Sequence, residues 1–155
     1  MYLGIDIGGT KTLVATLSDD GQIINKNRFP TSDDYRQFLI DLEENLKLLE
    51  LEDSYRCCVA VPGLLDREKG VVFALGNLPW RNEHIRDDIS EILGGAHVII
   101  ENDSRLAGLS EAQLVRDAYN NVLFATVSTG IGGALIRDGR IVTALQDTEF
   151  GKMPL

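Results

Sequence analysis

The sequence is poor in the residues that characterise disulfide scaffolds, fibrous proteins and membrane spans. Its 155 residues include 2 cysteines, 4 prolines and 6% aromatic residues. No stretch reaches the roughly 18–20 apolar residues of a transmembrane helix. Basic residues are also few, since 15 lysines and arginines stand against 24 aspartates and glutamates, for a formal net charge of −9. This acidity repels a phosphate backbone, so we expect neither a nucleic-acid partner nor a membrane partner.

The two cysteines and two histidines are placed where neither a disulfide nor a metal site is expected. Cys57 and Cys58 are neighbours in one apolar run, and successive side chains of a strand point to opposite faces. We therefore expect two free thiols in a reducing cytosol. His84 and His97 are isolated in the sequence, so we expect no zinc site. The first residues lack the basic region of a signal peptide, which favours a cytoplasmic protein.

The composition that remains, 44% hydrophobic and 25% charged, is typical of globular domains. Apolar runs at residues 2–7, 12–17 and 22–29 predict an antiparallel meander of three strands. Apolar residues then recur every three or four positions over residues 32–49, which predicts a helix with Ser32 as its N-cap.

Strands and helices alternate along the rest of the chain. The expected strands are residues 56–61, 71–74, 97–100, 122–128, 134–136 and 140–144, and the expected helices are residues 82–93 and 104–119. These elements predict an α/β fold with a mixed sheet flanked by helices. A strand, glycine turn and strand occur near residues 5–12 and again near 126–135, so we expect two related lobes, residues 1–120 and 121–155.

The first candidate site is Asp6-Ile-Gly-Gly-Thr-Lys-Thr12, at a tight turn between two strands. Its glycines allow the backbone to approach a ligand and to direct N–H groups at an anion in a nest. Thr10 adds a hydroxyl group, and Lys11 adds a positive charge. Asp6 ends the first strand, where its carboxylate would orient Mg²⁺ through water. Taken alone, the segment is better explained as an ordinary hairpin turn, and it lacks the spacing of a Walker A loop.

Two further segments carry chemically useful groups. Glu101-Asn-Asp-Ser104 lies where a strand passes into a helix, and a helix N-terminus favours an ionised Asp103 that would accept the proton of a substrate hydroxyl. The alternative is that Asp103 only caps the helix. Ser128-Thr-Gly-Ile-Gly-Gly-Ala134 is a second glycine-rich turn. A matched pair of such turns would hold a polyphosphate between two lobes, whereas a single one is compatible with a simple hairpin.

Five segments together resemble the ROK family (repressor, open reading frame, kinase), which includes bacterial glucokinases, fructokinases and N-acetylhexosamine kinases. In family order and spacing they are Asp6–Lys11, Val61–Gly63, Gly76–Trp80, Glu101–Asp103 and Thr129–Gly133. The resemblance implies an actin-like ATPase (ribonuclease H-like) lobe, followed by the first hairpin of a second lobe. It also implies ATP and Mg²⁺ as cofactors and a hexose-type sugar as the partner.

The resemblance assigns roles by position. Asp103 is the implied catalytic base, which activates a sugar hydroxyl for attack on the γ-phosphate of ATP. The implied ATP-binding residues are Asp6, Gly8, Gly9, Thr10, Lys11, Gly130, Gly132 and Gly133. The implied sugar-binding residues are Gly63, Asn77, Asn102, Asp103, Glu149 and Lys152. Asp6 is the implied Mg²⁺ residue, through water.

Several positions depart from the family pattern. Lys152 replaces the histidine of zinc-binding members and no cysteine-rich segment follows, so the resemblance implies no zinc site. Lys152 would then either donate to a sugar hydroxyl or favour another substrate. Arg105 stands where asparagine is frequent, and Ala134 where glycine is frequent. The sequence ends at Leu155, before the adenine pocket of the family, so we expect activity to require a C-terminal lobe that this chain lacks.

The sequence therefore predicts ATP-dependent phosphorylation of a hexose or hexose derivative. The alternative is a non-catalytic sugar-binding remnant or regulatory module. A third class, the chaperone or filament ATPases of the actin superfamily, is disfavoured by Gly76–Trp80 and Glu101–Asp103. Apolar hairpin residues such as Leu135 and Ile136 would be exposed on an unfinished lobe, so we expect a homo-oligomer or a complementing C-terminal chain.

Overall fold

The structure is a computed structural model that describes residues 1–49, 51, 55–127 and 131–142. Packing divides the chain into two compact units, Met1–Asn102 and Asp103–Leu155, which we name unit 1 and unit 2. The predicted boundary near Asn120 falls inside unit 2, and the assignment of residues 1–120 and 121–155 to two lobes stays a prediction. No helix in the described part of the chain is both long and apolar enough to cross a membrane.

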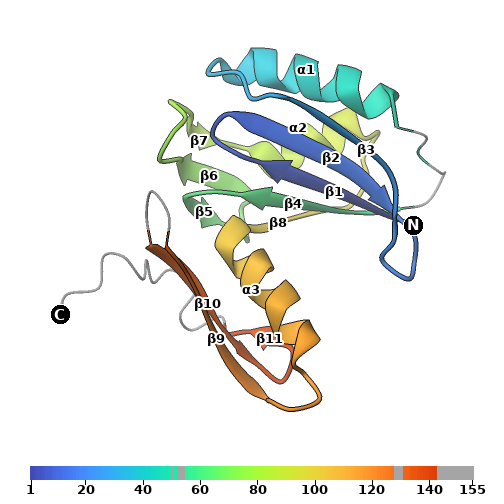
Figure 1. The fold of residues 1–155 in the computed structure, drawn as a ribbon. Helices are drawn as coiled ribbons and strands as arrows, with labels where there is room; N and C mark the ends of the chain where they lie inside the picture. Colours follow the sequence, from blue (N-terminus) through green and yellow to red (C-terminus); the bar gives the residue numbers. More distant parts are fainter. Residues whose placement is uncertain (50, 52–54, 128–130, 143–155) are drawn as a thin grey trace. The chain divides into compact units, whose positions relative to one another are not determined.

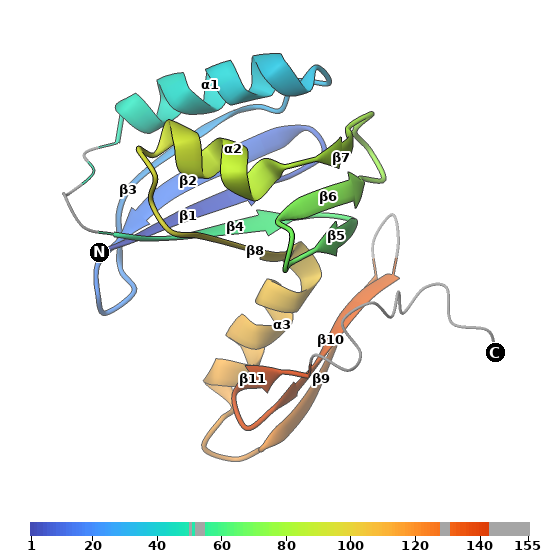
Figure 2. The same ribbon diagram turned by 180° about the vertical axis from the view of Figure 1, so that it is seen from behind.

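The described elements alternate between strands and helices, as the sequence predicts (Figures 1 and 2). Unit 1 contains β1 (Tyr2–Ile7), β2 (Lys11–Leu17), β3 (Ile23–Pro30), α1 (Tyr35–Lys47), β4 (Arg56–Val61), β5 (Leu64–Asp66), β6 (Val71–Ala74), β7 (Arg81–Glu83), α2 (Ile85–Ile92) and β8 (Val98–Asn102). Unit 2 contains α3 (Asp103–Leu114), β9 (Asn121–Val127), β10 (Ile131–Arg137) and β11 (Arg140–Ile141).

A five-stranded mixed sheet forms the centre of unit 1, with the strand order β3-β2-β1-β4-β8. The pairs β1–β2 and β2–β3 are antiparallel, which confirms the predicted meander. The pairs β1–β4 and β4–β8 are parallel. Because the carboxyl ends of parallel strands meet at one edge, β1, β4 and β8 bring the segments that follow them to the same side of the sheet.

One face of this sheet is apolar because hydrophobic residues alternate along its strands. Leu3 pairs with Cys57, which pairs with Val98, and all three side chains are buried. Phe38 of α1 and Ile89 of α2 belong to the same hydrophobic core. Both helices therefore cover the face to which these residues point, and α1 and α2 also contact each other.

The N-cap of α1 lies two residues after the predicted one. The side chain of Asp34 accepts a hydrogen bond from the backbone N–H of Gln37 at 2.9 Å, whereas the Ser32 hydroxyl accepts one from the N–H of Asp34 at 3.2 Å. Ser32 thus shapes the chain before the helix, and Asp34 caps it. The prediction of Ser32 was wrong because several residues with capping side chains stand in a row.

The helix predicted at residues 82–93 also begins later than expected. Residues Arg81–Glu83 form β7, and Asn82 has a positive φ of 58°, so its backbone does not enter a helix. α2 begins at Ile85 and ends at Ile92, before Gly94 and Gly95, which both have positive φ. β7 completes a small antiparallel sheet with the order β5-β6-β7. Pairing with β6 therefore overrides the local helical pattern at residues 82–84.

Unit 2 consists of a three-stranded antiparallel sheet, β11-β10-β9, packed against α3. Helix and sheet approach closely at Gly108, where an added Cβ would lie 2.9 Å from the Cβ atoms of Ala134 and Phe124. Ile136 is 1% exposed in this contact, so the expectation that it would be exposed was wrong. The sequence shows that Ile136 is apolar but not which face α3 covers.

Candidate functional site

The turn between β1 and β2 is fixed by hydrogen bonds from Thr31, a residue that no sequence motif indicated. The Gly8 N–H donates to the carbonyl of Lys11 at 3.0 Å. The Thr31 hydroxyl donates to the carbonyl of Gly8 at 2.9 Å, and the Thr31 N–H donates to the carbonyl of Thr10 at 3.0 Å. A buried contact of 2.9 Å joins the hydroxyl groups of Thr31 and Thr12. The turn is thus held by one hydrogen bond within it and by two from Thr31, which directly follows β3.

Gly8 and Gly9 are required by space and not by backbone handedness. A Cβ at Gly8 would lie 2.8 Å from the carbonyl oxygen of Lys11, and a Cβ at Gly9 would lie 2.7 Å from the Cβ of Asn77. Neither glycine has positive φ, so the requirement for glycine at these two positions comes from the lack of space for a side chain. The N–H groups of Gly9 and Thr10 make no hydrogen bond within the part of the chain that the structure describes.

Asn77 lies in the segment between β6 and β7, and its neighbours hold it in place. Leu75, Leu78 and Trp80 are buried in the core of unit 1, and the indole N–H of Trp80 donates to the carbonyl of Asp33 at 3.0 Å. Their packing leaves Asn77 exposed and against Gly9. The structure therefore brings a predicted sugar-binding residue into contact with the predicted phosphate turn.

Gly63 and Asn102 meet at the carboxyl ends of β4 and β8. Val61 pairs with Asn102 in the parallel register, and the side-chain amide of Asn102 donates to the carbonyl of Gly63 at 3.3 Å. Gly63 has a φ of +89°, and a Cβ there would lie 2.2 Å from the carbonyl oxygen of Ala74. Only glycine fits this backbone without a shift of β6. Two predicted sugar-binding residues are thus hydrogen-bonded to each other.

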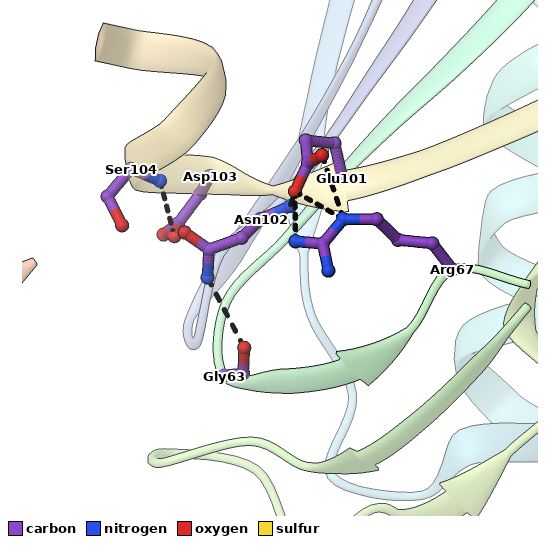
Figure 3. Close-up of polar contacts among 6 residues, drawn as sticks. All are labelled: Gly63, Arg67, Glu101, Asn102, Asp103 and Ser104. Carbon is purple, nitrogen blue, oxygen red and sulfur yellow. Dashed lines mark hydrogen bonds and ion pairs between the residues drawn. The ribbon is translucent and has the colours of Figure 1, made fainter. Parts of the chain in front are cut away.

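Glu101 is tied to Arg67, a pair that no sequence motif indicated (Figure 3). The Nε of Arg67 lies 2.9 Å and 2.8 Å from the two carboxylate oxygens of Glu101, and Nη2 of Arg67 also donates to Oε1. The same Oε1 accepts the backbone N–H of Asn102 at 2.7 Å. The charge of Glu101, together with burial, raises the pKa of the nearby Cys58 thiol.

Asp103 opens α3 and is exposed, as expected for a group that would meet a substrate. Its Oδ1 accepts the backbone N–H of Ser104 at 2.7 Å (Figure 3). Within unit 2, a Cβ at Gly132 would lie 2.8 Å from the hydroxyl oxygen of Ser104. Gly132 of β10 therefore packs against the first turn of the helix that carries Asp103. Gly133, the next residue of β10, is buried.

Three predicted site residues, Gly130, Glu149 and Lys152, lie outside the described residues. The described part of the chain contains no cluster of three histidine, cysteine, aspartate or glutamate side chains that would hold a metal ion. Asp6 is an exposed carboxylate at the end of β1, directly before the turn that Thr31 fixes. This placement fits Mg²⁺, which binds through one or two carboxylates together with phosphate oxygens and water.

A mixed five-stranded sheet with a glycine turn between its first two strands, flanked by helices, defines one lobe of the actin-like ATPase fold. The sequence matches the ROK family over residues 2–155. The chain belongs to this family, which confirms the resemblance and the fold class predicted from the five motifs.

Individual relatives agree with this assignment. An N-acetyl-D-glucosamine kinase of Yersinia pestis is 33% identical over 164 residues, which cover 100% of this chain and 62% of the relative. A ROK hexokinase from Thermus thermophilus superposes with a TM-score of 0.82 at 29% identity, over 99% of this chain and 53% of that one. An inorganic polyphosphate/ATP-glucomannokinase from Arthrobacter sp. strain KM gives a TM-score of 0.79 at 28% identity, over 99% of this chain and 64% of that one.

The chain spans about half the length of the curated relatives it matches, between 45% and 62%.

Proposed function

We propose that the protein takes part in the ATP-dependent phosphorylation of a hexose or hexose derivative. The observation that carries this proposal is the exposed Asp103 at the N-terminus of α3, directly after Asn102, whose side chain is hydrogen-bonded to Gly63. The carboxylate of Asp103 and the side-chain amide of Asn102 are consecutive in the chain, which suits a substrate with hydroxyl groups on neighbouring carbons. Names of relatives support the same reaction, since they include an N-acetyl-D-glucosamine kinase, a ROK hexokinase and an inorganic polyphosphate/ATP-glucomannokinase.

In the proposed mechanism, Asp103 is the base, two asparagines bind the sugar and the β1–β2 turn binds the phosphates. Asp103 takes the proton of the sugar hydroxyl that attacks the γ-phosphate. Asn102 and Asn77 bind sugar hydroxyls. The N–H groups of Gly9 and Thr10, with the charge of Lys11, bind phosphate oxygens. Mg²⁺ carried by ATP supplies charge neutralisation, and Asp6 would hold it through water.

An ADP-release assay tests this proposal over a panel of sugars that includes glucose, mannose, fructose and the N-acetylhexosamines. The chain is assayed alone and mixed with the C-terminal half of the Yersinia relative, because it spans about half of the relatives' length. We expect sugar-dependent ADP release with at least one sugar. Absence of sugar-dependent release in both preparations would contradict the proposal. Inorganic polyphosphate replaces ATP in a parallel assay that identifies the phosphoryl donor.

Sugar binding without turnover is the second candidate function. It is favoured by the contacts within unit 1, where Gly63, Asn77 and Asn102 are fixed by that unit's own residues. Calorimetry with each sugar, with and without ATP, separates the two candidates. Sugar binding that ATP does not change supports the binding module, whereas coupling between sugar and ATP supports the kinase.

Partner chains and location are proposed from the exposed surface of unit 2 and from the need for ATP. Leu123, Val127 and Ile131 of unit 2 are exposed apolar side chains on neighbouring strands, which supports self-association or a complementing chain. Size-exclusion chromatography with light scattering tests this, and a clean monomer would contradict it. The proposed location is the cytoplasm, where ATP is available.

A further inference from the structure

Arg67 lies outside every sequence motif, and its side chain binds Glu101, the residue before Asn102 of the candidate site. It follows β5 directly, in the turn that leads to β6. Its guanidinium group contacts both carboxylate oxygens of Glu101, and the side chains of the two residues are 20% and 16% exposed. A guanidinium group that reaches both oxygens of one carboxylate, with little water nearby, fixes the orientation of that carboxylate.

The carboxylate of Glu101, oriented by Arg67, in turn binds the backbone of Asn102. Its Oε1 accepts from Arg67 and also from the backbone N–H of Asn102 at 2.7 Å. A carboxylate in this geometry must stay in one rotamer to keep both bonds. The carboxylate that binds the backbone N–H of Asn102, one residue before Asp103, is therefore itself fixed by Arg67.

The hairpin formed by β5 and β6 also binds the side chain of Asn102. Gly63, directly before β5, accepts the side-chain amide of Asn102, while Arg67, directly after β5, holds the carboxylate of Glu101 (Figure 3). The two ends of one short strand are thus attached to two consecutive residues of β8. This arrangement fixes both the backbone N–H and the side chain of Asn102.

The turn that carries Arg67 is itself held by α2. Arg86 of α2 donates to the carbonyls of Glu68 at 2.9 Å and Lys69 at 3.1 Å. A Cβ at Gly70 would lie 2.6 Å from the Cβ of Arg86, so the turn and the helix are in close contact. Arg67 is therefore part of a rigid support and not a side chain on a loose loop.

We propose that Arg67 is a positioning residue, which acts through Glu101 to hold Asn102 in the arrangement needed for sugar phosphorylation. This inference rests on the proposed function for its catalytic part. Within the described part of the chain, the hydrogen bonds of the Arg67 side chain all go to Glu101, which is not assigned to the reaction. Its effect is expected on the sugar and not on ATP, because Asn102 is assigned to the sugar and the β1–β2 turn to the phosphates.

Arg67→Met and Arg67→Lys test the proposal, with Lys69→Met as the control. Lys69 lies in the same turn, and its side chain makes, among the described residues, only an ion pair of 3.5 Å with Asp66. In the mixture that phosphorylates sugar, Arg67→Met lowers kcat/KM for the sugar about tenfold or more, while KM for ATP changes less than about twofold. Arg67→Lys recovers part of the loss because it keeps the charge but not the contact with both oxygens. Lys69→Met has no effect.

Amide hydrogen exchange at Asn102 gives a readout that does not depend on turnover. Arg67→Met accelerates exchange at Asn102 about tenfold or more, while exchange in β1 is unchanged; Lys69→Met accelerates neither. Unchanged exchange at Asn102 overturns the positioning role, whatever the kinetics show. Faster exchange with wild-type sugar kinetics overturns the catalytic part. A wild-type preparation that phosphorylates no sugar overturns the proposed function, and the exchange result then decides the structural role of Arg67 by itself.

Discussion

At the scale of single residues, the candidate site is built from short contacts that leave little freedom. Gly9 lies against Asn77, Gly63 lies against the backbone of β6, and Thr31 holds the turn between β1 and β2. Each contact joins residues that are distant in the sequence. A substitution at one of them therefore changes the position of a second site residue as well as its own.

Replacement of Asp103 by asparagine is expected to remove turnover and keep the fold. Asparagine retains a side-chain oxygen that accepts the N–H of Ser104, so the start of α3 keeps its hydrogen bond. It cannot take a proton, and general-base catalysis is worth about 10²–10⁴ in rate. The ADP-release assay measures the loss, and the thermal midpoint serves as the control for folding. Near-normal turnover in this variant would show that Asp103 is not the base.

Replacement of Gly63 by alanine is expected to destabilise unit 1 by about 3 kcal/mol or more. The added Cβ would lie 2.2 Å from the carbonyl oxygen of Ala74, in addition to the strain of a φ of +89°. Gly21→Ala is the matched control, since Gly21 has a φ of +83° but nothing within 4 Å. It is expected to cost about 1 kcal/mol. Urea denaturation measures both, and equal losses would contradict the steric explanation.

At the scale of elements, the first residue of each helix is decided by a capping side chain or by the end of the preceding strand. α1 begins after Asp34 because that carboxylate accepts the N–H of Gln37. α2 begins only after β7 has paired with β6. α3 begins at Asp103, directly after β8, without an intervening loop. The last case matters for function because it places the proposed base at a helix N-terminus.

Two substitutions before α1 test the assignment of its N-cap. Asp34→Ala removes the acceptor for the N–H of Gln37 and is expected to cost about 1 kcal/mol of the free energy of unfolding. Ser32→Ala removes only a 3.2 Å contact in front of the helix and is expected to cost less than about 0.5 kcal/mol. Urea denaturation followed by circular dichroism compares the two. A larger loss for Ser32→Ala would reverse the assignment.

At the scale of the whole molecule, the two units have separate hydrophobic cores. The core of unit 1 includes the buried face of the five-stranded sheet and the single tryptophan, Trp80. The core of unit 2 is small and consists of Ala112, Ala134 and Ile136 with partly buried neighbours. Trp80 fluorescence therefore reports the unfolding of unit 1. The net charge of −9 is compatible with phosphate binding because the proposed contacts are local N–H groups and one lysine.

The stability of unit 1 is expected to fall in alkaline solution because of Cys57. Burial raises the pKa of this thiol from 9.0 to about 12. Between these values the unfolded chain loses the proton that the folded chain keeps, so the free energy of unfolding decreases as pH rises. Through Cys57, the free energy of unfolding is expected to fall by about 2 kcal/mol between pH 9 and about 10.5. Urea denaturation followed by Trp80 fluorescence measures it as the difference in slope between wild type and Cys57→Ala. Parallel curves would contradict the expectation.

The sequence by itself determined the features that depend on local pattern. The meander of β1–β3, the strand that ends before Pro62-Gly63 and the strand-to-helix junction at Asp103 all follow from apolar spacing and turn residues. Five motifs in order then indicated the family. Local signals misplaced the N-cap of α1 and extended α2 into β7, since neighbouring residues offered competing caps and strand pairing is not local.

Only the tertiary structure decided which distant residues meet. The contact between Gly9 and Asn77, the hydrogen bonds from Thr31, and the ion pair between Arg67 and Glu101 join different elements. The sequence pattern shows which residues are apolar, charged or small, but it does not encode the distance between two side chains on separate elements. That distance is set by the register of β1, β4 and β8 and by the packing of α1 and α2, which bury one face of the sheet to remove apolar surface from water.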